Sequence, residues 1–144
     1  MSRVTAGLIG VALYLALVFA LYGFHYVALL DTDGSYPDWY APGELLLRAL
    51  TSVAPGIMAG WLCRAGGLVT GACVGGVGGA AEALVLGALI GVPLGEFGAR
   101  VSVAVVSTGL ASALTNAVGG VAGEALWQKF QPPGDSSAVS APLR

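Results

Sequence analysis

Charged residues are scarce in this sequence. Asp, Glu, Lys and Arg make up 10% of its 144 residues, whereas hydrophobic residues make up 56% and the mean hydropathy is +0.82. Soluble domains carry about a quarter charged residues, so this composition excludes an ordinary soluble domain and is typical of a membrane protein. The net charge is −2, and no cluster of Lys or Arg occurs. We therefore expect membrane lipid around the chain and no nucleic-acid partner.

Residues that commonly hold metals or carry out catalysis are few as well. The two cysteines, Cys63 and Cys73, belong to no Cys-x-x-Cys pair, and His25 is the only histidine. A structural zinc site needs about four ligands of this kind. The sequence also lacks HExxH, GxSxG and the phosphate-binding GxxxxGK[ST] motif. We expect neither a metal nor a cofactor, and no enzymatic activity.

The single histidine, His25, lies near the end of the first apolar segment, beside Tyr22 and Tyr26. One interpretation places it in the aromatic belt at the membrane–water interface. The other makes it functional, either as a ligand to a pigment or haem or as a sensor of external pH, because imidazole changes charge near neutrality. The sequence leaves both interpretations open.

Long apolar runs are what the sequence does contain. Crossing a bilayer takes about 20 residues of helix, and four runs are long enough. They predict an all-α integral membrane bundle of four transmembrane helices, up-down-up-down, over residues 4–30, 45–63, 68–92 and 101–127. An acidic connection, 31–44, separates the first two helices. After this transmembrane domain, 1–130, the segment 131–144 is rich in Pro, Ser and Gly and predicts a mobile cytoplasmic tail.

The distribution of Lys and Arg predicts the orientation, because these residues are enriched on the cytoplasmic side of a membrane. Most of them fall at one end of the predicted bundle. That end holds Arg3, Arg64, Lys129 and Arg144, and the other end holds Arg48 and Arg100. We therefore expect both termini in the cytoplasm and the chain in the inner membrane of a prokaryotic cell.

Glycines recur at steps of four residues along the third predicted helix, with Ala83 at one of the steps. They are Gly67, Gly71, Gly75, Gly79, Gly87 and Gly91, and the second helix adds Gly56 and Gly60. Small residues at this spacing let helices approach closely within a membrane. Each step of four residues drifts by about 40° around the helix, so the glycines move to nearly the opposite face between Gly71 and Gly91. The third helix should therefore pack on two sides and take a central position.

A proline, Pro55, lies within the second predicted helix. It has no backbone N–H to donate to the carbonyl of Thr51, and it should kink the helix there. The freed carbonyl then needs another donor. The hydroxyls of Thr51 and Ser52 are close enough in sequence to be candidates.

Glu82 is the only charged residue between positions 67 and 95. Helical geometry places it on the same side as Gly71 and Gly75, so it should face another helix or a cavity and not lipid. Two interpretations stay open. Glu82 is either a protonated hydrogen-bonding partner that joins helices, or a proton or cation site in a permeation path or carrier.

The fourth predicted helix offers polar partners at a similar depth. Thr108, Ser112 and Thr115 share one face of it, and Asn116 lies beside them. We predict a hydrogen bond from Glu82 to Asn116 or to Thr115. The alternative is that the hydroxyls on this face bond to carbonyls of their own helix.

Two functional hypotheses follow. The leading one is a packing or accessory subunit, which acts through helix contacts in a homo-oligomer or with other membrane subunits. The abundance of close-packing glycine and the lack of catalytic motifs favour it. The alternative is a small channel or carrier that uses Glu82 as an intramembrane proton or cation site.

Overall fold

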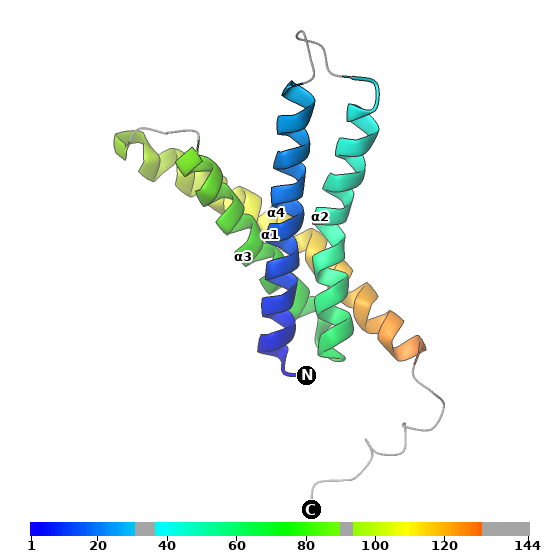
Figure 1. Cartoon of the computed structure of the whole chain (residues 1–144). Coiled ribbons are helices and arrows are strands. Elements are labelled where there is room, and N and C mark those ends of the chain that lie inside the picture. The colour runs from blue at the N-terminus through cyan, green and yellow to red at the C-terminus, as the bar shows by residue number, and fades with distance from the viewer. Residues whose placement is uncertain (31–36, 90–93, 131–144) are drawn as a thin grey trace, which may run out of the picture.

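Four long helices make up the described part of the chain (Figure 1). The computed structural model describes residues 1–30, 37–89 and 94–130. The helices are α1 (Arg3–Leu30), α2 (Tyr40–Cys63), α3 (Gly67–Leu89) and α4 (Leu94–Lys129). No strand occurs among these residues, and the predicted all-α bundle is confirmed. Gly91 and the predicted tail, 131–144, lie outside the described residues.

Each helix is long and apolar enough to cross a membrane. The candidate spans are Arg3–Ala28, Tyr40–Cys63, Gly67–Gly87 and Ser102–Lys129. Large apolar side chains on the outer surfaces of the helices remain uncovered. Leu8 of α1, Leu45 of α2 and Leu114 of α4 are 65%, 71% and 71% exposed. Lipid solvates such a surface, whereas a monomeric soluble protein rarely exposes one.

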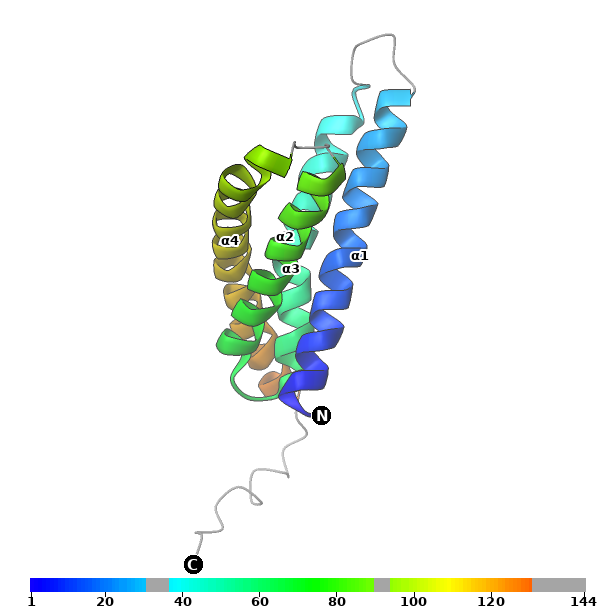
Figure 2. The same ribbon diagram turned by 90° about the vertical axis from the view of Figure 1, so that its left-hand side faces the viewer.

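The chain runs back and forth between two ends of the bundle. We call the end that holds Arg3 and the α2–α3 turn the N side, and the end at which α1 ends and α2 begins the loop side (Figure 1). Helices α2 and α3 lie between α1 and α4, and each of them contacts all of the remaining helices (Figure 2). The predicted central position of the glycine-rich helix is thus confirmed, and α2 shares it.

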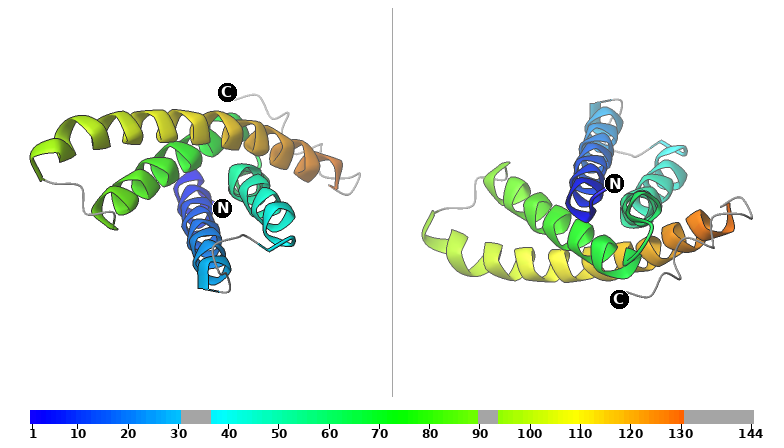
Figure 3. Two further views of the ribbon diagram at one scale, coloured as in Figure 1. Left: turned by 90° about the horizontal axis from the view of Figure 1, so that it is seen from above. Right: turned by 90° about the horizontal axis from the view of Figure 1, so that it is seen from below.

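Helix α4 forms one long side of the molecule when the bundle is seen from its ends (Figure 3). Helix α1 stands away from it. In the part of the chain that the structure describes, the backbones of α1 and α4 do not contact one another. Side chains must therefore bridge the space between these two helices.

Two helices begin several residues earlier than the sequence predicts. Helix α2 starts at Tyr40, so Pro42 falls in its first turn, and α4 starts at Leu94, directly after Pro93 in the sequence. The first N–H groups of a helix have no partner within it, so proline is tolerated there and its fixed φ suits a helix start. The prediction used polarity to mark each start, but a helix can continue beyond the apolar part of a membrane.

Glycines bring α4 into backbone contact with its neighbours. A Cβ atom added to any of four glycines of α3 would strike α4: at Gly67 it would meet Gly120, at Gly71 Asn116, and at Gly75 and Gly79 Ser112. The same holds for two glycines of α2, because a Cβ atom at Gly56 would meet Asn116 and one at Gly60 would meet Gly120. Gly87 is buried as well. Only a residue without a side chain lets two backbones approach this closely. All of these contacts join helices of the same chain.

The ring of Pro55 is fully buried, and α2 is continuous across it. The Thr51 hydroxyl donates to the Leu47 carbonyl at 2.8 Å, and the Ser52 hydroxyl donates to the Arg48 carbonyl at 2.7 Å. Both hydroxyls therefore bond one turn back along α2. They do not supply the donor that we predicted for the Thr51 carbonyl.

Candidate functional site

Glu82 of α3 accepts hydrogen bonds from two tyrosines of α1. The Tyr14 hydroxyl donates to Oε2 at 2.8 Å, and the Tyr22 hydroxyl donates to Oε1 at 3.1 Å. Each carboxylate oxygen thus has one donor from a neighbouring helix. An ionisable side chain is costly inside a membrane, and these two bonds hold the carboxylate within the bundle and away from lipid.

Tyr14 extends this contact to α4. Its hydroxyl lies 2.9 Å from Ser112 Oγ. Its ring packs against Gly78, where a Cβ atom would lie 2.6 Å from the ring. Tyr14 is only 2% exposed. Its side chain therefore bridges α1 to both α3 and α4, across the space where the backbones of α1 and α4 stay apart.

A polar cavity lies beside Glu82. Its volume is about 220 Å³, and all four helices contribute to its lining. The lining residues are Tyr14, Leu21, Arg48, Thr51, Ser52, Glu82, Thr108 and Ser112. A cavity of this size holds several water molecules, and hydroxyl, carboxylate and guanidinium groups are present to bond them.

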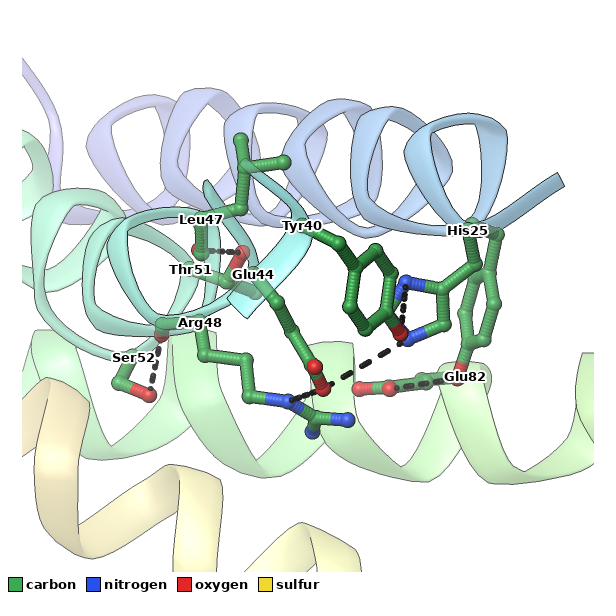
Figure 4. A network of polar contacts seen from close by, with 9 residues as sticks. His25, Tyr40, Glu44, Leu47, Arg48, Thr51, Ser52 and Glu82 are labelled. Atoms are coloured by element: carbon green, nitrogen blue, oxygen red, sulfur yellow. Dashed lines mark hydrogen bonds and ion pairs between the residues drawn. The ribbon is translucent and has the colours of Figure 1, made fainter. Parts of the chain in front are cut away.

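Toward the loop side the cavity meets a group of charged and aromatic side chains (Figure 4). Arg48 Nε donates to Glu44 Oε1 at 2.7 Å, and the same oxygen lies 3.7 Å from His25 Nε2. The other ring nitrogen of His25, Nδ1, lies 3.4 Å from the Tyr40 hydroxyl. We call His25, Tyr40, Glu44 and Arg48 the loop-side cluster. The ring of Tyr22 meets the His25 ring edge to face, with centroids 6.3 Å apart, and thereby joins the cluster to the carboxylate site.

The partners predicted for Glu82 on α4 are wrong. Asn116 is fully buried, but its Oδ1 accepts the Gly56 N–H at 2.9 Å and its Nδ2 donates to the Ser112 carbonyl at 3.0 Å. Thr115 is exposed and donates to carbonyls of its own helix. Ser112 lies one turn, about 6 Å, nearer the loop side than Asn116. The predicted register of α4 against α3 was therefore about one turn in error.

Of the polar residues predicted on α4, the structure brings two to the site. Ser112 bonds to Tyr14, and Thr108 lines the cavity. Asn116 instead holds α2 to α4 through the Gly56 N–H, deeper toward the N side. Thr115 belongs to the outer surface. His25 reaches the region through the loop-side cluster.

Sequence reasoning missed Tyr14 and Tyr22 as partners of Glu82. A signal was present, because both tyrosines lie well inside an apolar span, where a hydroxyl needs a partner. Glu124 was missed as well. Its Oε2 accepts the Gly67 N–H at 2.7 Å, at the start of α3, where backbone donors lack partners and the helix dipole favours negative charge.

Metal ligands do not gather at this site. In the described residues no three His, Cys, Asp or Glu side chains come together to hold a metal ion. Cys63 is buried and Cys73 is exposed, and both are free thiols. The chemistry that the site offers is that of one carboxylate, several hydroxyls and a nearby arginine.

The Tyr14 hydroxyl should contribute measurably to stability. In Tyr14→Phe the ring keeps its contact with Gly78, but Glu82 and Ser112 lose their shared partner. A hydrogen bond to a charged group contributes about 1.5–3 kcal/mol, and we expect a loss of that size in the free energy of unfolding. Unfolding in SDS, followed by tryptophan fluorescence, measures it. Tyr26→Phe, at an exposed tyrosine on the same helix, should change the free energy of unfolding little. Equal losses in both variants would contradict the hydrogen bonds assigned to the Tyr14 hydroxyl.

The four apolar spans and the polar site between them define the class, a multi-pass helical membrane protein. No protein-family model, curated protein or solved structure matches the chain. A fold of this kind hosts many activities, so the function has to follow from the site.

Proposed function

We propose that this protein is a small membrane carrier that binds a proton or a small cation at Glu82. One observation carries the proposal. The Glu82 carboxylate lies within a bundle of four candidate spans, beside a polar cavity of about 220 Å³, and no basic side chain among the described residues forms an ion pair with it. Ionisable residues that face the interior of a membrane bundle commonly belong to ion pathways or proton relays.

A purely structural role would not require the cavity. Hydrogen bonds from Tyr14 and Tyr22 already join α1 to α3, and a neutral amide could also bond both hydroxyls, by accepting through its oxygen and donating through its nitrogen. The side chains of Thr51 and Thr108 border open space next to the carboxylate. Protein interiors are otherwise close-packed, so a polar space beside a single carboxylate is better explained by a species that binds there.

The structure also changes the support for an accessory subunit. That hypothesis depended on the many glycines, which could have served contacts with other chains. Gly56, Gly60, Gly67, Gly71 and Gly75 all pack against α4 of the same chain. These glycines are therefore explained by the fold of the monomer, and they no longer favour a partner protein.

For the location, we propose the cytoplasmic membrane of a prokaryotic cell with both termini in the cytoplasm. Support comes from the basic residues, because Arg3, Arg64 and Lys129 all belong to the N side and Arg48 to the loop side. The N side would then face the cytoplasm, and the loop side the exterior.

Flux into liposomes tests the proposal. The purified protein is reconstituted around a trapped pH-sensitive dye, and a pH gradient is imposed while potassium and valinomycin clamp the membrane potential. Parallel samples receive sodium or potassium gradients and the matching cation dye. We expect flux above that of protein-free liposomes, and its complete loss in Glu82→Gln, which keeps the size of the side chain but cannot ionise.

Glu124→Gln is the matched control, because Glu124 is also a carboxylate on a membrane helix but bonds the Gly67 N–H on the N side, outside the cavity. It should keep the wild-type flux. Wild-type protein that moves neither protons nor cations, or a Glu82→Gln variant with undiminished flux, would refute the carrier function.

A further inference from the structure

The path from Glu82 to the N side is closed by close packing. Val74 of α3 and Asn116 of α4 are fully buried there. Gly71 and Gly75 hold the α3 backbone against the α4 backbone over the same stretch. Packing of this kind leaves no space for water between α3 and α4. A groove of about 380 Å³ does lie between α1 and α3 on the N side, but mainly apolar side chains such as Val74 and Val77 line it and Glu82 does not. In this conformation, the N side therefore offers no polar route to the carboxylate.

The path to the loop side is shorter and polar. Glu82 lies seven residues before Leu89, the end of α3, and 15 residues after Gly67, its start. At about 1.5 Å per residue these are distances of about 10 and 22 Å. Arg48 lines the cavity, and its side chain is 60% exposed. The Glu82 cavity thus reaches the loop-side cluster through a side chain that is itself accessible.

Tyr22 connects the cluster to the carboxylate a second time. Its hydroxyl donates to Glu82 Oε1, and its ring contacts the ring of His25. The side chains of His25 and Glu44 are each 25% exposed, so they are partly accessible from outside the bundle. The loop-side cluster and Glu82 therefore lie on one side of the bundle, joined by the cavity at Arg48 and by the ring contact between Tyr22 and His25 (Figure 4).

The charges along this path suit a proton and not a metal cation. The Arg48 guanidinium, which is permanently charged, lines the same cavity as Glu82 and would repel a metal cation. A metal cation would also compete with the Tyr14 and Tyr22 hydroxyls for the carboxylate oxygens. A proton meets neither obstacle, because it neutralises Glu82 and leaves no added positive charge in the cavity.

We infer that Glu82 exchanges protons with the loop side and is closed to the N side in this conformation, with the loop-side cluster as the entry. The inference rests on the proposed carrier function and narrows its substrate to the proton. An N–H bond of protonated His25 breaks, cavity water relays the proton, and an O–H bond forms at Glu82. His25 and Glu82 both end neutral. Among the side chains that the structure describes, the other titratable or charged groups that face this path are Tyr14, Tyr22, Tyr40, Glu44 and Arg48.

Thiol labelling tests the sidedness of the cavity without measuring flux. In a background with Cys63→Ala and Cys73→Ala, Thr108→Cys places a thiol in the cavity lining, and Leu110→Cys places one on the lipid-facing surface of the same helix, where Leu110 is 62% exposed. A charged, membrane-impermeant methanethiosulfonate reacts with the thiolate, which forms only in contact with water. We expect Thr108→Cys to react from the loop side at least about tenfold faster than Leu110→Cys, and not from the N side.

Right-side-out and inside-out vesicles present the two faces separately. Asp38→Cys and Ser2→Cys, both at exposed positions, report reagent on the loop side and on the N side. Ser52→Cys provides a second cavity thiol from α2 if Thr108→Cys does not assemble. Cavity labelling from the N side, or from neither side, would overturn the inference. If Glu82→Gln still abolished flux in that case, the carrier function would stand and only the route would fail.

Two flux measurements test whether the substrate is a proton and whether the loop-side cluster is its entry. Sodium and potassium gradients should give no flux that depends on Glu82, and such a flux would show that the substrate is a metal cation. His25→Gln removes the titratable group at the entry, and we expect proton flux to fall by about tenfold or more while Thr108→Cys labelling is unchanged. Tyr26→Phe, one residue further along α1, is the control. Undiminished proton flux in His25→Gln would overturn the role of the cluster.

Discussion

Gly75→Ala should destabilise the protein strongly, although alanine is the better helix former. A Cβ atom at position 75 would collide with the Ser112 carbonyl and with the backbone of Ala113. Neither of these backbone atoms can rotate away, so α3 and α4 must separate along their contact. Overpacking of this kind costs about 1–3 kcal/mol and occasionally more, and we expect a value near the upper limit because the struck atoms are backbone. Unfolding in SDS measures the loss.

The adjacent glycine provides a matched control. A Cβ atom on Gly76 would have Ala113 Cβ as its nearest neighbour at 3.8 Å, an ordinary contact. Gly76→Ala should therefore be neutral or more stable by up to about 1 kcal/mol, from helix propensity alone. Equal effects of Gly75→Ala and Gly76→Ala would show that the α3–α4 contact is looser than the structure has it.

Asn116→Leu should give the second large loss of stability. Asn116 is fully buried, and its Oδ1 accepts the N–H of Gly56, one residue after Pro55. Leucine has a similar volume but no acceptor, so it takes this partner away from the Gly56 N–H. An unsatisfied buried donor costs about 1–3 kcal/mol. The same SDS unfolding assay applies, and loss of the α2–α4 contact should accompany the change.

Thr115→Ala controls for any general sensitivity of α4. Thr115 is the preceding residue, it is exposed, and its hydroxyl bonds only within its own helix. Its replacement should change the free energy of unfolding by less than about 0.5 kcal/mol, as is usual for surface positions. If Asn116→Leu were as mild as Thr115→Ala, Asn116 would not be the link between α2 and α4 that its position indicates.

The architecture could be predicted from sequence because it depends on composition and length. Apolar runs long enough to span a membrane predict four helices, and regularly spaced glycines predict that helix backbones approach one another closely. The starts of α2 and α4 were harder to predict from the sequence, since a proline such as Pro42 or Pro93 is compatible with either a connection or a helix start. Polarity decides where the membrane ends and not where helical hydrogen bonding begins.

Of the candidate site, the sequence predicted the central residue, Glu82, but not the residues that bond to it. Glu82 is conspicuous in the sequence because it interrupts a long apolar segment with a charge. Its partners were not, because Tyr14 lies 68 residues away and Tyr22 lies 60 residues away, on α1. The register between two helices is set by how their surfaces interlock, and an error of one turn was enough to propose Asn116 in place of Ser112.

The sequence by itself determined that this is an all-helical protein of four spans, with one carboxylate held inside and glycines that allow tight packing. Those properties follow from hydropathy, helix length and side-chain size, which are local. The tertiary structure alone decided that the glycines of α2 and α3 that face α4 serve contacts within the chain, that tyrosines of α1 hold Glu82, and that a polar cavity lies beside it near Arg48. These properties depend on helix register and on which faces meet, and distant residues set both at once.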